Sequence, residues 1–216
     1  MEELYSRLAP VWDATLTMSG FKRGLCRYVL KTVSECKVSE PKILDVGCGT
    51  GLVSFALLKK FPGASIVATD VNEDMVRKAE QLAKRKKIDE KDLIIGRADV
   101  LDQDVVTLSD DSVVHLSPNS FDVVIASGVL EYTPLDLAVP KLLSLLKPDG
   151  LLMVISIKDD TSVGRLWGKV YKFVPIEKSE LKRSLKVHGC RHVIHSPLTY
   201  KEFPANMTRT GLLAVK

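Results

Sequence analysis

A glycine-rich run beside an acidic residue is the part of this sequence best suited to chemistry. The run reads Asp45-Val46-Gly47-Cys48-Gly49-Thr50-Gly51 and ends a short apolar segment that begins at Lys42. Glycines let a backbone approach a bound molecule closely, and a helix that starts nearby offers N–H groups to it. Three alternate glycines beside an acid exceed what a turn requires. We therefore expect a ligand-binding loop, with a purely structural turn as the alternative.

The spacing of the glycines argues against a dinucleotide as that ligand. Dinucleotide-binding loops follow GxGxxG, with a ribose-binding acid about 20 residues further on. Here Leu52 stands where the third glycine of that pattern belongs, and the glycines follow GxGxG instead. Asp70 lies 19 residues beyond Gly51, where its carboxylate can accept hydrogen bonds from both ribose hydroxyls. An ordinary helix cap is the alternative role for Asp70.

Alternating strands and helices must position these residues. The hydrophobic pattern predicts strands at 42–46, 65–69, 93–96, 121–126 and 151–157, helices at 2–8, 21–33, 52–61, 72–85, 138–146 and 179–187, and a turn at 147–150. Two late extended segments, 191–199 and 208–215, can pair antiparallel at a sheet edge. This order predicts an α/β fold, a Rossmann-like, doubly wound, seven-stranded and mostly parallel sheet with a closing antiparallel hairpin and helices on both faces. Ligands bind such sheets along the carboxyl ends of the strands.

Composition indicates an ordinary globular chain of one domain. The 216 residues include 31 Lys and Arg and 27 Asp and Glu, for a net charge of +4, and 45% are hydrophobic. This balance excludes disordered, collagen-like and coiled-coil classes. No apolar run approaches the roughly 20 residues of a spanning helix, and the start, MEELYSRLAP, is unlike a signal peptide. We expect a cytoplasmic protein.

Cysteines and histidines do not form a recognisable metal site. The four cysteines, Cys26, Cys36, Cys48 and Cys190, include no CxxC pair, and we expect free thiols. The nearest ligand cluster, which spans 188–195, surrounds a predicted strand start, and we expect no metal. The densest basic run, at 84–87, ends a predicted helix, where cations suit the helix dipole and face solvent.

Several motifs together resemble the class I S-adenosylmethionine-dependent methyltransferases. The run from Ile43 to Gly51 is similar to that family's first motif. Further segments resemble its later motifs in order: Ala68-Thr69-Asp70, Ala98-Asp99-Val100, Phe121-Asp122-Val123-Val124-Ile125-Ala126 and Leu145-Leu146-Lys147-Pro148-Asp149-Gly150. Asp149 stands where a glycine is commoner. The match covers 42–152, and its combination of motifs is specific although each motif alone is not.

The resemblance implies S-adenosyl-L-methionine as cofactor and S-adenosyl-L-homocysteine as product. It implies that the glycines line the methionine and ribose, that Asp45 organises the loop and the cofactor amine, and that Asp70 holds the ribose. It also implies that Asp99 accepts a hydrogen bond from the adenine amino group. The remaining implied contacts are Val71, Met75 and Val100 on the adenine, Ser127 and Gly128 beside the methionine, and Cys48 as a small filler of the loop formed by Gly47, Gly49 and Gly51.

The amino terminus carries a narrower similarity. The segment Tyr5-Ser6-Arg7-Leu8-Ala9-Pro10-Val11-Trp12-Asp13 resembles the lid of quinone-biosynthesis and phospholipid methyltransferases, the methyltransferase type 11 subgroup, in which aromatic residues cover the cofactor. Trp12 replaces a more usual tyrosine. Tyr5 and Trp12 are therefore expected to contact the cofactor, with a role as core anchors as the alternative. The implied single domain comprises a helical lid (1–40), a cofactor-binding core (42–157), a substrate-side insertion (158–176) and a last helix with the closing hairpin (177–216).

Methyl transfer is an in-line displacement, so alignment and water exclusion matter most. An amine or phenol acceptor also benefits from a general base. Tyr132 is the first candidate and Glu131 the second, ahead of the three histidines at 188, 192 and 195.

Substrate selection is expected in two local insertions, 102–120 and 158–176. An apolar stripe within 158–176 lies opposite basic residues, and three uses remain open: a roof over an apolar pocket, a peripheral membrane helix, or an ordinary covering helix. The stripe comprises Val163, Leu166, Trp167, Val170, Tyr171 and Val174.

We expect methyl transfer to a small, hydrophobic metabolite. The alternatives are a lipid head group or quinone precursor, a non-catalytic S-adenosylmethionine-binding module and a nucleotide-dependent oxidoreductase. DNA is disfavoured as a substrate because Ala126-Ser127-Gly128-Val129 replaces the segment typical of base methylases, and RNA trails.

Overall fold

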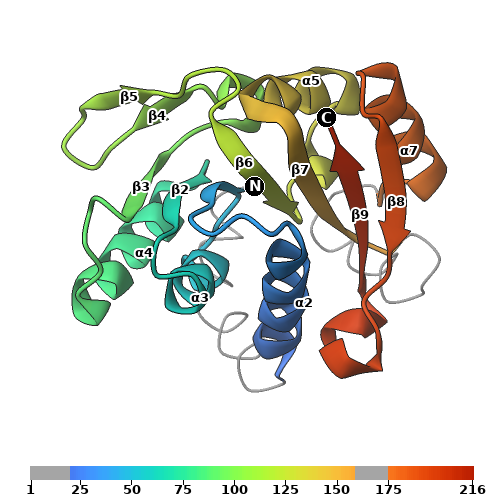
Figure 1. Cartoon of the computed structure of the whole chain (residues 1–216). Coiled ribbons are helices and arrows are strands. Elements are labelled where there is room, and N and C mark those ends of the chain that lie inside the picture. The colour runs from blue at the N-terminus through green and yellow to red at the C-terminus, as the bar shows by residue number, and fades with distance from the viewer. Residues whose placement is uncertain (1–19, 159–174) are drawn as a thin grey trace.

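One nine-stranded sheet organises the chain (Figure 1). The computed structural model describes residues 20–158 and 175–216. Its strand order is β5-β4-β3-β2-β1-β6-β7-β9-β8. The strands are β1 (Lys42–Val46), β2 (Ser65–Asp70), β3 (Leu93–Arg97), β4 (Val105–Thr107), β5 (Val113–His115), β6 (Phe121–Ser127), β7 (Leu146–Ile157), β8 (His192–Ser196) and β9 (Arg209–Val215). The predicted α/β fold with a mostly parallel sheet is confirmed.

Five of these strands form the parallel centre. Strands β3, β2, β1, β6 and β7 run parallel, and β9 and β8 close the sheet as an antiparallel pair. β-branched and aliphatic runs make the central strands, because a parallel sheet is covered on both faces.

The prediction of seven strands was wrong by two. Segment 102–120, expected to be a local insertion, supplies β4 and β5, which extend the sheet antiparallel beyond β3. Each is only three residues long, and a polar turn joins them, so neither produces a strand-like pattern in the sequence. The predicted turn at 147–150 was also wrong, since these residues belong to β7, whose pairing with β6 shifts register between Phe121 and Val123.

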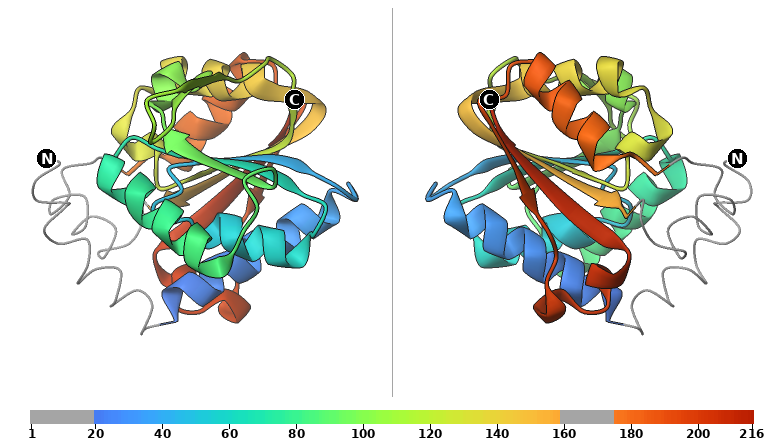
Figure 2. Two further views of the ribbon diagram at one scale, coloured as in Figure 1. Left: turned by 90° about the vertical axis from the view of Figure 1, so that its left-hand side faces the viewer. Right: turned by 90° about the vertical axis from the view of Figure 1, so that its right-hand side faces the viewer.

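Helices cover both faces of the sheet (Figure 2). On one face lie α2 (Phe21–Glu35), α3 (Leu52–Lys60) and α4 (Glu73–Lys86), and on the other α5 (Leu135–Leu145) and α7 (Lys178–Val187). Each face has its own buried apolar cluster, and the buried side chains of the central strands alternate between the two. Among the helices of the described residues, none is long and apolar enough to cross a membrane.

Local sequence explains where α4 begins and ends. The Asn72 side chain accepts hydrogen bonds from the backbone N–H groups of Asp74 and Met75. Acidic residues occupy the first turn, and basic residues occupy the last, as the helix dipole favours. This cap places the N-terminus of α4 directly after Asp70, the last residue of β2.

Candidate active site

The predicted site residues meet at the carboxyl ends of the central strands. Register places Val46 of β1 opposite Thr69 of β2 and Ala126 of β6, and Thr69 opposite Gly96 of β3. The four strands therefore end at the same level. Those residues predicted to bind the cofactor that the structure describes all lie at these strand ends or in the segments that follow them.

The glycine loop after β1 leaves space beside its backbone. Gly47, Gly49 and Gly51 all have positive φ, and the Cys48 backbone N–H donates to the carbonyl oxygen of Thr69 at 2.9 Å. A Cβ on Gly47 would lie 2.2 Å from a methyl group of Val129, so that glycine permits contact with the loop after β6. A Cβ on Gly49 would meet no heavy atom within 4 Å. Gly49 therefore faces open space.

Gly128, in the loop after β6, faces open space in the same way. Its φ is +68°, and a Cβ there would also find nothing within 4 Å. Its backbone N–H donates to the carbonyl oxygen of Ile155 in β7, which fixes the loop to the neighbouring strand. Two main-chain segments, around Gly49 and Gly128, thus border open space where β1 and β6 end side by side.

Asp70 holds the glycine loop and the start of α4 together. One carboxylate oxygen accepts the Gly49 backbone N–H and the other accepts the Asn72 backbone N–H, both at 2.9 Å. Burial raises the pKa of Asp70, and these two hydrogen bonds oppose the rise. Each oxygen can accept more than one hydrogen bond, so the carboxylate retains acceptor capacity for a ligand.

Asp45 lies beneath the loop. It is 2% exposed, and the Ser54 hydroxyl of α3 donates to its carboxylate at 2.6 Å. Burial raises the pKa of Asp45 to about 6, with the Ser54 hydrogen bond opposing the rise and the nearby Asp70 charge adding to it. Asp45 therefore ties β1 to α3. Sequence analysis did not identify Ser54, because nothing in the spacing of the two residues marks them as partners.

The residues predicted beside the adenine differ in exposure. Asp99 is exposed and accepts the Leu101 backbone N–H at 2.9 Å, which caps the short 3-10 helix η1 (Val100–Asp102). Val100 and Met75 are buried, whereas Val71 is exposed at the rim. Together they give this end of the site an acidic acceptor beside apolar side chains.

Gln103 is a polar residue of this region that sequence analysis missed. It is fully buried, and its side-chain amide donates to the Thr69 hydroxyl at 2.8 Å. Its carbonyl oxygen has no hydrogen-bond partner among the described residues. Gln103 therefore links the segment after β3 to β2, the strand that carries Asp70.

The two candidate bases differ in position. Glu131 is buried within the 3-10 helix η2 (Leu130–Tyr132), and its carboxylate accepts the Ile157 backbone N–H at 2.7 Å. Burial raises the pKa of Glu131, and this hydrogen bond opposes the rise. Such a residue fixes the loop after β6 to the end of β7, which favours a positioning role over that of a base. Tyr132 is about half exposed and stays a candidate.

Cys48 lies within the glycine loop, whereas the histidines considered as bases lie in or beside α7 and β8. Burial raises the pKa of the Cys48 thiol well above its ordinary value, so the thiol is protonated at neutral pH. His188 contacts the carbonyl oxygen of Ser184 within α7, and His195 contacts the Thr210 hydroxyl. Among the described ranges, no three potential ligands group into a metal site. The predicted contacts Tyr5 and Trp12 and the apolar stripe at 163–174 lie outside the described residues.

Comparison with known proteins agrees with this arrangement. The family described as a methyltransferase domain matches residues 44–152. The malonyl-(acyl-carrier protein) O-methyltransferase of Gallionella capsiferriformans strain ES-2 is 26% identical over 189 residues, which cover 87% of this chain and 60% of that protein. The ubiquinone/menaquinone biosynthesis C-methyltransferase UbiE of Cereibacter sphaeroides is 34% identical over 116 residues, 53% of this chain and 41% of that protein. The chain thus spans less than two thirds of the length of these relatives.

Solved structures share the fold at low identity. Magnesium protoporphyrin IX methyltransferase of Synechocystis PCC 6803 with bound SAH aligns at a TM-score of 0.66 and 19% identity, over 91% of this chain and 84% of that one. Geranyl diphosphate methyltransferase in complex with SAM aligns at a TM-score of 0.68 and 11% identity, over 88% and 84%.

Proposed function

The chain belongs to the class I S-adenosylmethionine-dependent methyltransferases, and we propose that it transfers a methyl group from S-adenosylmethionine to a small, hydrophobic acceptor. The observation that carries this proposal is the open space beside the backbone of Gly49 and also beside that of Gly128, two glycines that follow the adjacent strands β1 and β6. Bare backbone on two sides accommodates a bulky ligand without displacing side chains.

The residues on the ribose side of this space fit the cofactor. The Asp70 carboxylate is already turned toward the glycine loop by its bond to the Gly49 N–H, and it retains lone pairs for ribose hydroxyls. Asp45, buried below, supports the loop through its hydrogen bond with Ser54. The loop and its acid are therefore held in place before the cofactor binds.

The two ends of the cofactor find different surroundings. At the adenine end, Asp99 offers an exposed carboxylate for the amino group. Ser127, the last residue of β6, and Gly128 are assigned to the methionine end, and Gly128 has open space beside its backbone. The apolar surroundings proposed for the adenine ring are Val71, Met75 and Val100.

S-adenosylmethionine, when bound, supplies an electrophilic methyl group on a sulfonium. The chain's own part is to hold donor and acceptor in line and to exclude water, so no covalent intermediate with the protein is required. Glu131 positions the loop after β6 through the Ile157 N–H. Tyr132, the last residue of η2 in the same loop, is the group proposed for proton transfer if the acceptor must be deprotonated.

The names of the relatives favour two further classes of acceptor. Relatives named for malonyl-(acyl-carrier protein) and for ubiquinone or menaquinone biosynthesis point to an acyl carboxylate or a quinone precursor. A quinone precursor fits the proposed hydrophobic class, whereas a malonyl group on a carrier protein is charged and would be a distinct alternative acceptor. A lipid head group and a non-catalytic binding module are the remaining alternatives.

Calorimetric titration tests the proposal. We expect S-adenosylmethionine and S-adenosylhomocysteine to bind and NAD not to bind. Asp70→Ala is expected to weaken cofactor affinity by about 1.5–3 kcal/mol, the usual range for a hydrogen bond to a charged group. Methyl transfer from labelled cofactor to a panel of apolar phenols, quinols and acyl carboxylates then separates an enzyme from an inert module.

Asp122→Ala is the matched control for Asp70→Ala. Asp122 also accepts a backbone N–H, that of Lys42 at 2.9 Å, but it does so at the opposite end of β1. Its removal is expected to leave cofactor affinity unchanged. Equal losses of affinity in both variants, or NAD binding in preference to S-adenosylmethionine, would overturn the proposal.

A further inference from the structure

A short segment between β8 and β9 exposes three large apolar side chains. Residues 199–208, which we name the tip segment, contain the 3-10 helices η3 (Tyr200–Glu202) and η4 (Ala205–Met207). Tyr200 is 79% exposed, Phe203 64% and Met207 55%. Single exposed apolar residues are common, but three within eight residues are a local excess of exposed apolar side chains of the kind found at binding surfaces.

The tip segment is fixed and is not a loose loop. Ala205 is fully buried in the core, and the buried Glu202 carboxylate accepts hydrogen bonds from the backbone N–H and the hydroxyl of Thr199. A Cβ on Gly24 of α2 would lie 2.3 Å from the carbonyl oxygen of Glu202, so the two segments pack backbone against backbone. The exposed side chains are therefore held outward by a rigid base.

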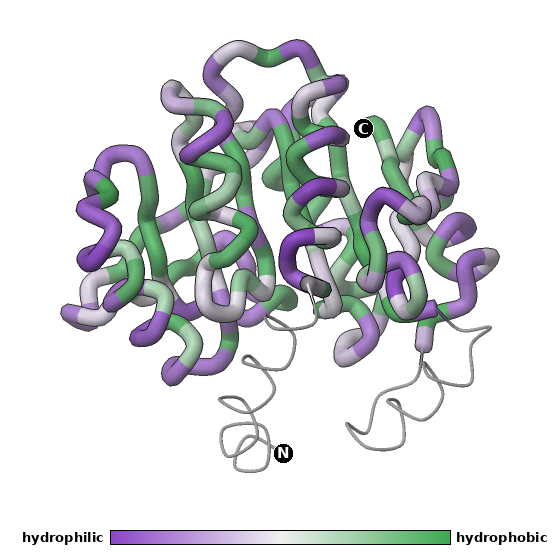
Figure 3. The backbone as a smooth tube through the Cα atoms, turned by 90° about the horizontal axis from the view of Figure 1, so that it is seen from below, coloured by the Kyte–Doolittle hydropathy of each residue, from purple (hydrophilic) through white to green (hydrophobic). Residues whose placement is uncertain are grey.

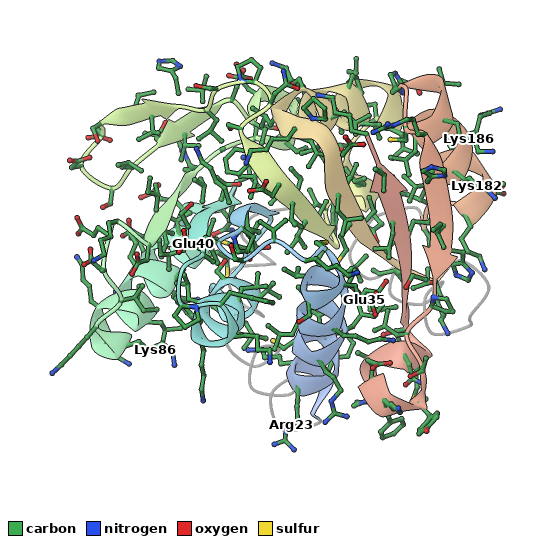
Figure 4. All side chains as sticks on the ribbon, viewed as in Figure 1. Arg23, Glu35, Glu40, Lys86, Lys182 and Lys186 are labelled. Carbon is green, nitrogen blue, oxygen red and sulfur yellow. The ribbon has the colours of Figure 1, made fainter. Side chains whose placement is uncertain are left out.

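A basic helix face lies directly beside the tip segment. Arg23, Arg27 and Lys31 recur every four residues along α2 and so share one side of that helix. Arg27 donates to the carbonyl oxygen of Lys201, which joins the helix face to the tip segment. Figure 4 shows Arg23 at the end of α2 that lies beside the tip segment, with its side chain directed away from the body.

An open groove of about 660 Å³ continues this surface. Its lining includes two apolar residues and several cations, and no residue of the glycine loop takes part. The residues that line it are Arg23, Cys26, Arg27, Leu30, Lys31, Ser34, Glu35 and Lys60. Four cations and one acid give this groove a net positive charge.

We propose that the tip segment and the basic face of α2 dock the protein on an anionic lipid surface. Apolar and aromatic side chains enter the boundary between head groups and acyl chains, and flanking Lys and Arg residues attract anionic head groups. The net positive charge of the adjoining groove complements an anionic surface, and contact with another protein chain is an outcome that the test below distinguishes. This docking does not depend on the proposed methyl transfer, and the residues that carry it are other than 158–176.

Vesicle flotation tests this surface. The full chain is expected to float with vesicles of phosphatidylcholine and phosphatidylglycerol and to stay behind with phosphatidylcholine alone. Arg23→Glu with Lys31→Glu is expected to reduce binding by more than about tenfold, since each cation near an anionic surface contributes roughly fivefold. Tyr200→Ser with Phe203→Ser is expected to cause a similar loss. Arg27 is left in place because of its bond to Lys201.

Lys182→Glu with Lys186→Glu is the matched control. It makes the same change in net charge on exposed positions of α7, on the other face of the sheet (Figure 4). Binding by this variant is expected to match the unchanged protein within about twofold, and all variants should keep their circular dichroism spectrum and cofactor affinity. The proposal is overturned if the unchanged protein does not float, or if the control loses as much binding as the test variants. Conversion of a dimer into a monomer by Tyr200→Ser with Phe203→Ser would overturn it too, and would identify a contact between two copies instead.

Discussion

Gly49 has a positive φ and faces open space. A larger side chain at this position can therefore block a ligand without meeting other protein atoms. We expect Gly49→Val to abolish measurable cofactor binding, because its side chain would occupy the space that the ligand needs. The protein should stay folded, since no protein atom lies within 4 Å of the added Cβ. Calorimetry and circular dichroism measure the two effects.

Gly189→Val supplies the control for backbone strain. Gly189 also has positive φ and open space around its Cβ position, but it follows α7, away from the glycine loop. This variant should lose stability through strain, as Gly49→Val does, and keep its cofactor affinity. Undiminished affinity in Gly49→Val would refute the assignment of the loop.

Asp45 makes stability depend on pH in a defined direction. Its pKa is about 6 in the folded protein and near 4 in an unfolded chain, so the folded state binds more protons between these values. Stability from this residue is therefore fully present below about pH 4 and is lost as pH rises toward 6, by roughly 2–3 kcal/mol. Asp45→Asn should remove this loss. Urea unfolding at several pH values measures the free energy of unfolding of both proteins. Parallel curves of this free energy against pH would contradict the prediction.

Hydrogen-bonded pairs between separate elements could not be predicted from the sequence. The glycine run, Asp70 and Asp99 were identified because their motifs are local and follow strand ends. Three hydrogen-bonded pairs depend instead on how separate elements pack, and no local spacing encodes that packing. These pairs are Asp45–Ser54, Gln103–Thr69 and Glu131–Ile157.

Among the elements, Glu131 links η2 to the end of β7. Substitutions of Glu131 can therefore show whether it positions the loop or acts as a base. Glu131→Gln keeps an oxygen that can accept the Ile157 N–H but cannot take a proton at neutral pH. A positioning residue predicts that this variant keeps the pH profile of methyl transfer, whereas Glu131→Ala lowers the rate and destabilises the fold by about 1–3 kcal/mol. A Gln variant as inactive as the Ala variant would restore Glu131 as a base.

The order of elements was predictable where the hydrophobic pattern is strong. Buried strands and amphipathic helices alternate from β1 to α4, and the predicted bounds there lie close to those of the structure. The strands β4 and β5 are too short to show a period, and the Lys147-Pro148-Asp149-Gly150 run has the composition of a turn although it lies in β7. For β4 and β5, pairing with a neighbouring strand overrides local preference, whereas residues 147–150 form an irregularity in β7 between the pairs Phe121–Leu146 and Val123–Leu151.

At the scale of the whole molecule, the sheet gathers the site from loops far apart in the sequence. The ends of β1, β2, β3 and β6 are level, so residues from 45 to 128 reach one edge. In the view from below in Figure 3, hydrophobic stretches of the chain lie mostly inside the molecule and hydrophilic stretches mostly at its outside. Family membership and the open glycine-lined space point to the same activity.

A crystal structure of the protein with S-adenosylhomocysteine tests whether the glycine loop holds the cofactor. We expect the adenosyl group to lie between Asp70 and Asp99, and the homocysteine part to pass along the backbone of Gly49 and Gly128. A ligand bound elsewhere, or a glycine loop closed over an empty space at saturating ligand, would contradict it.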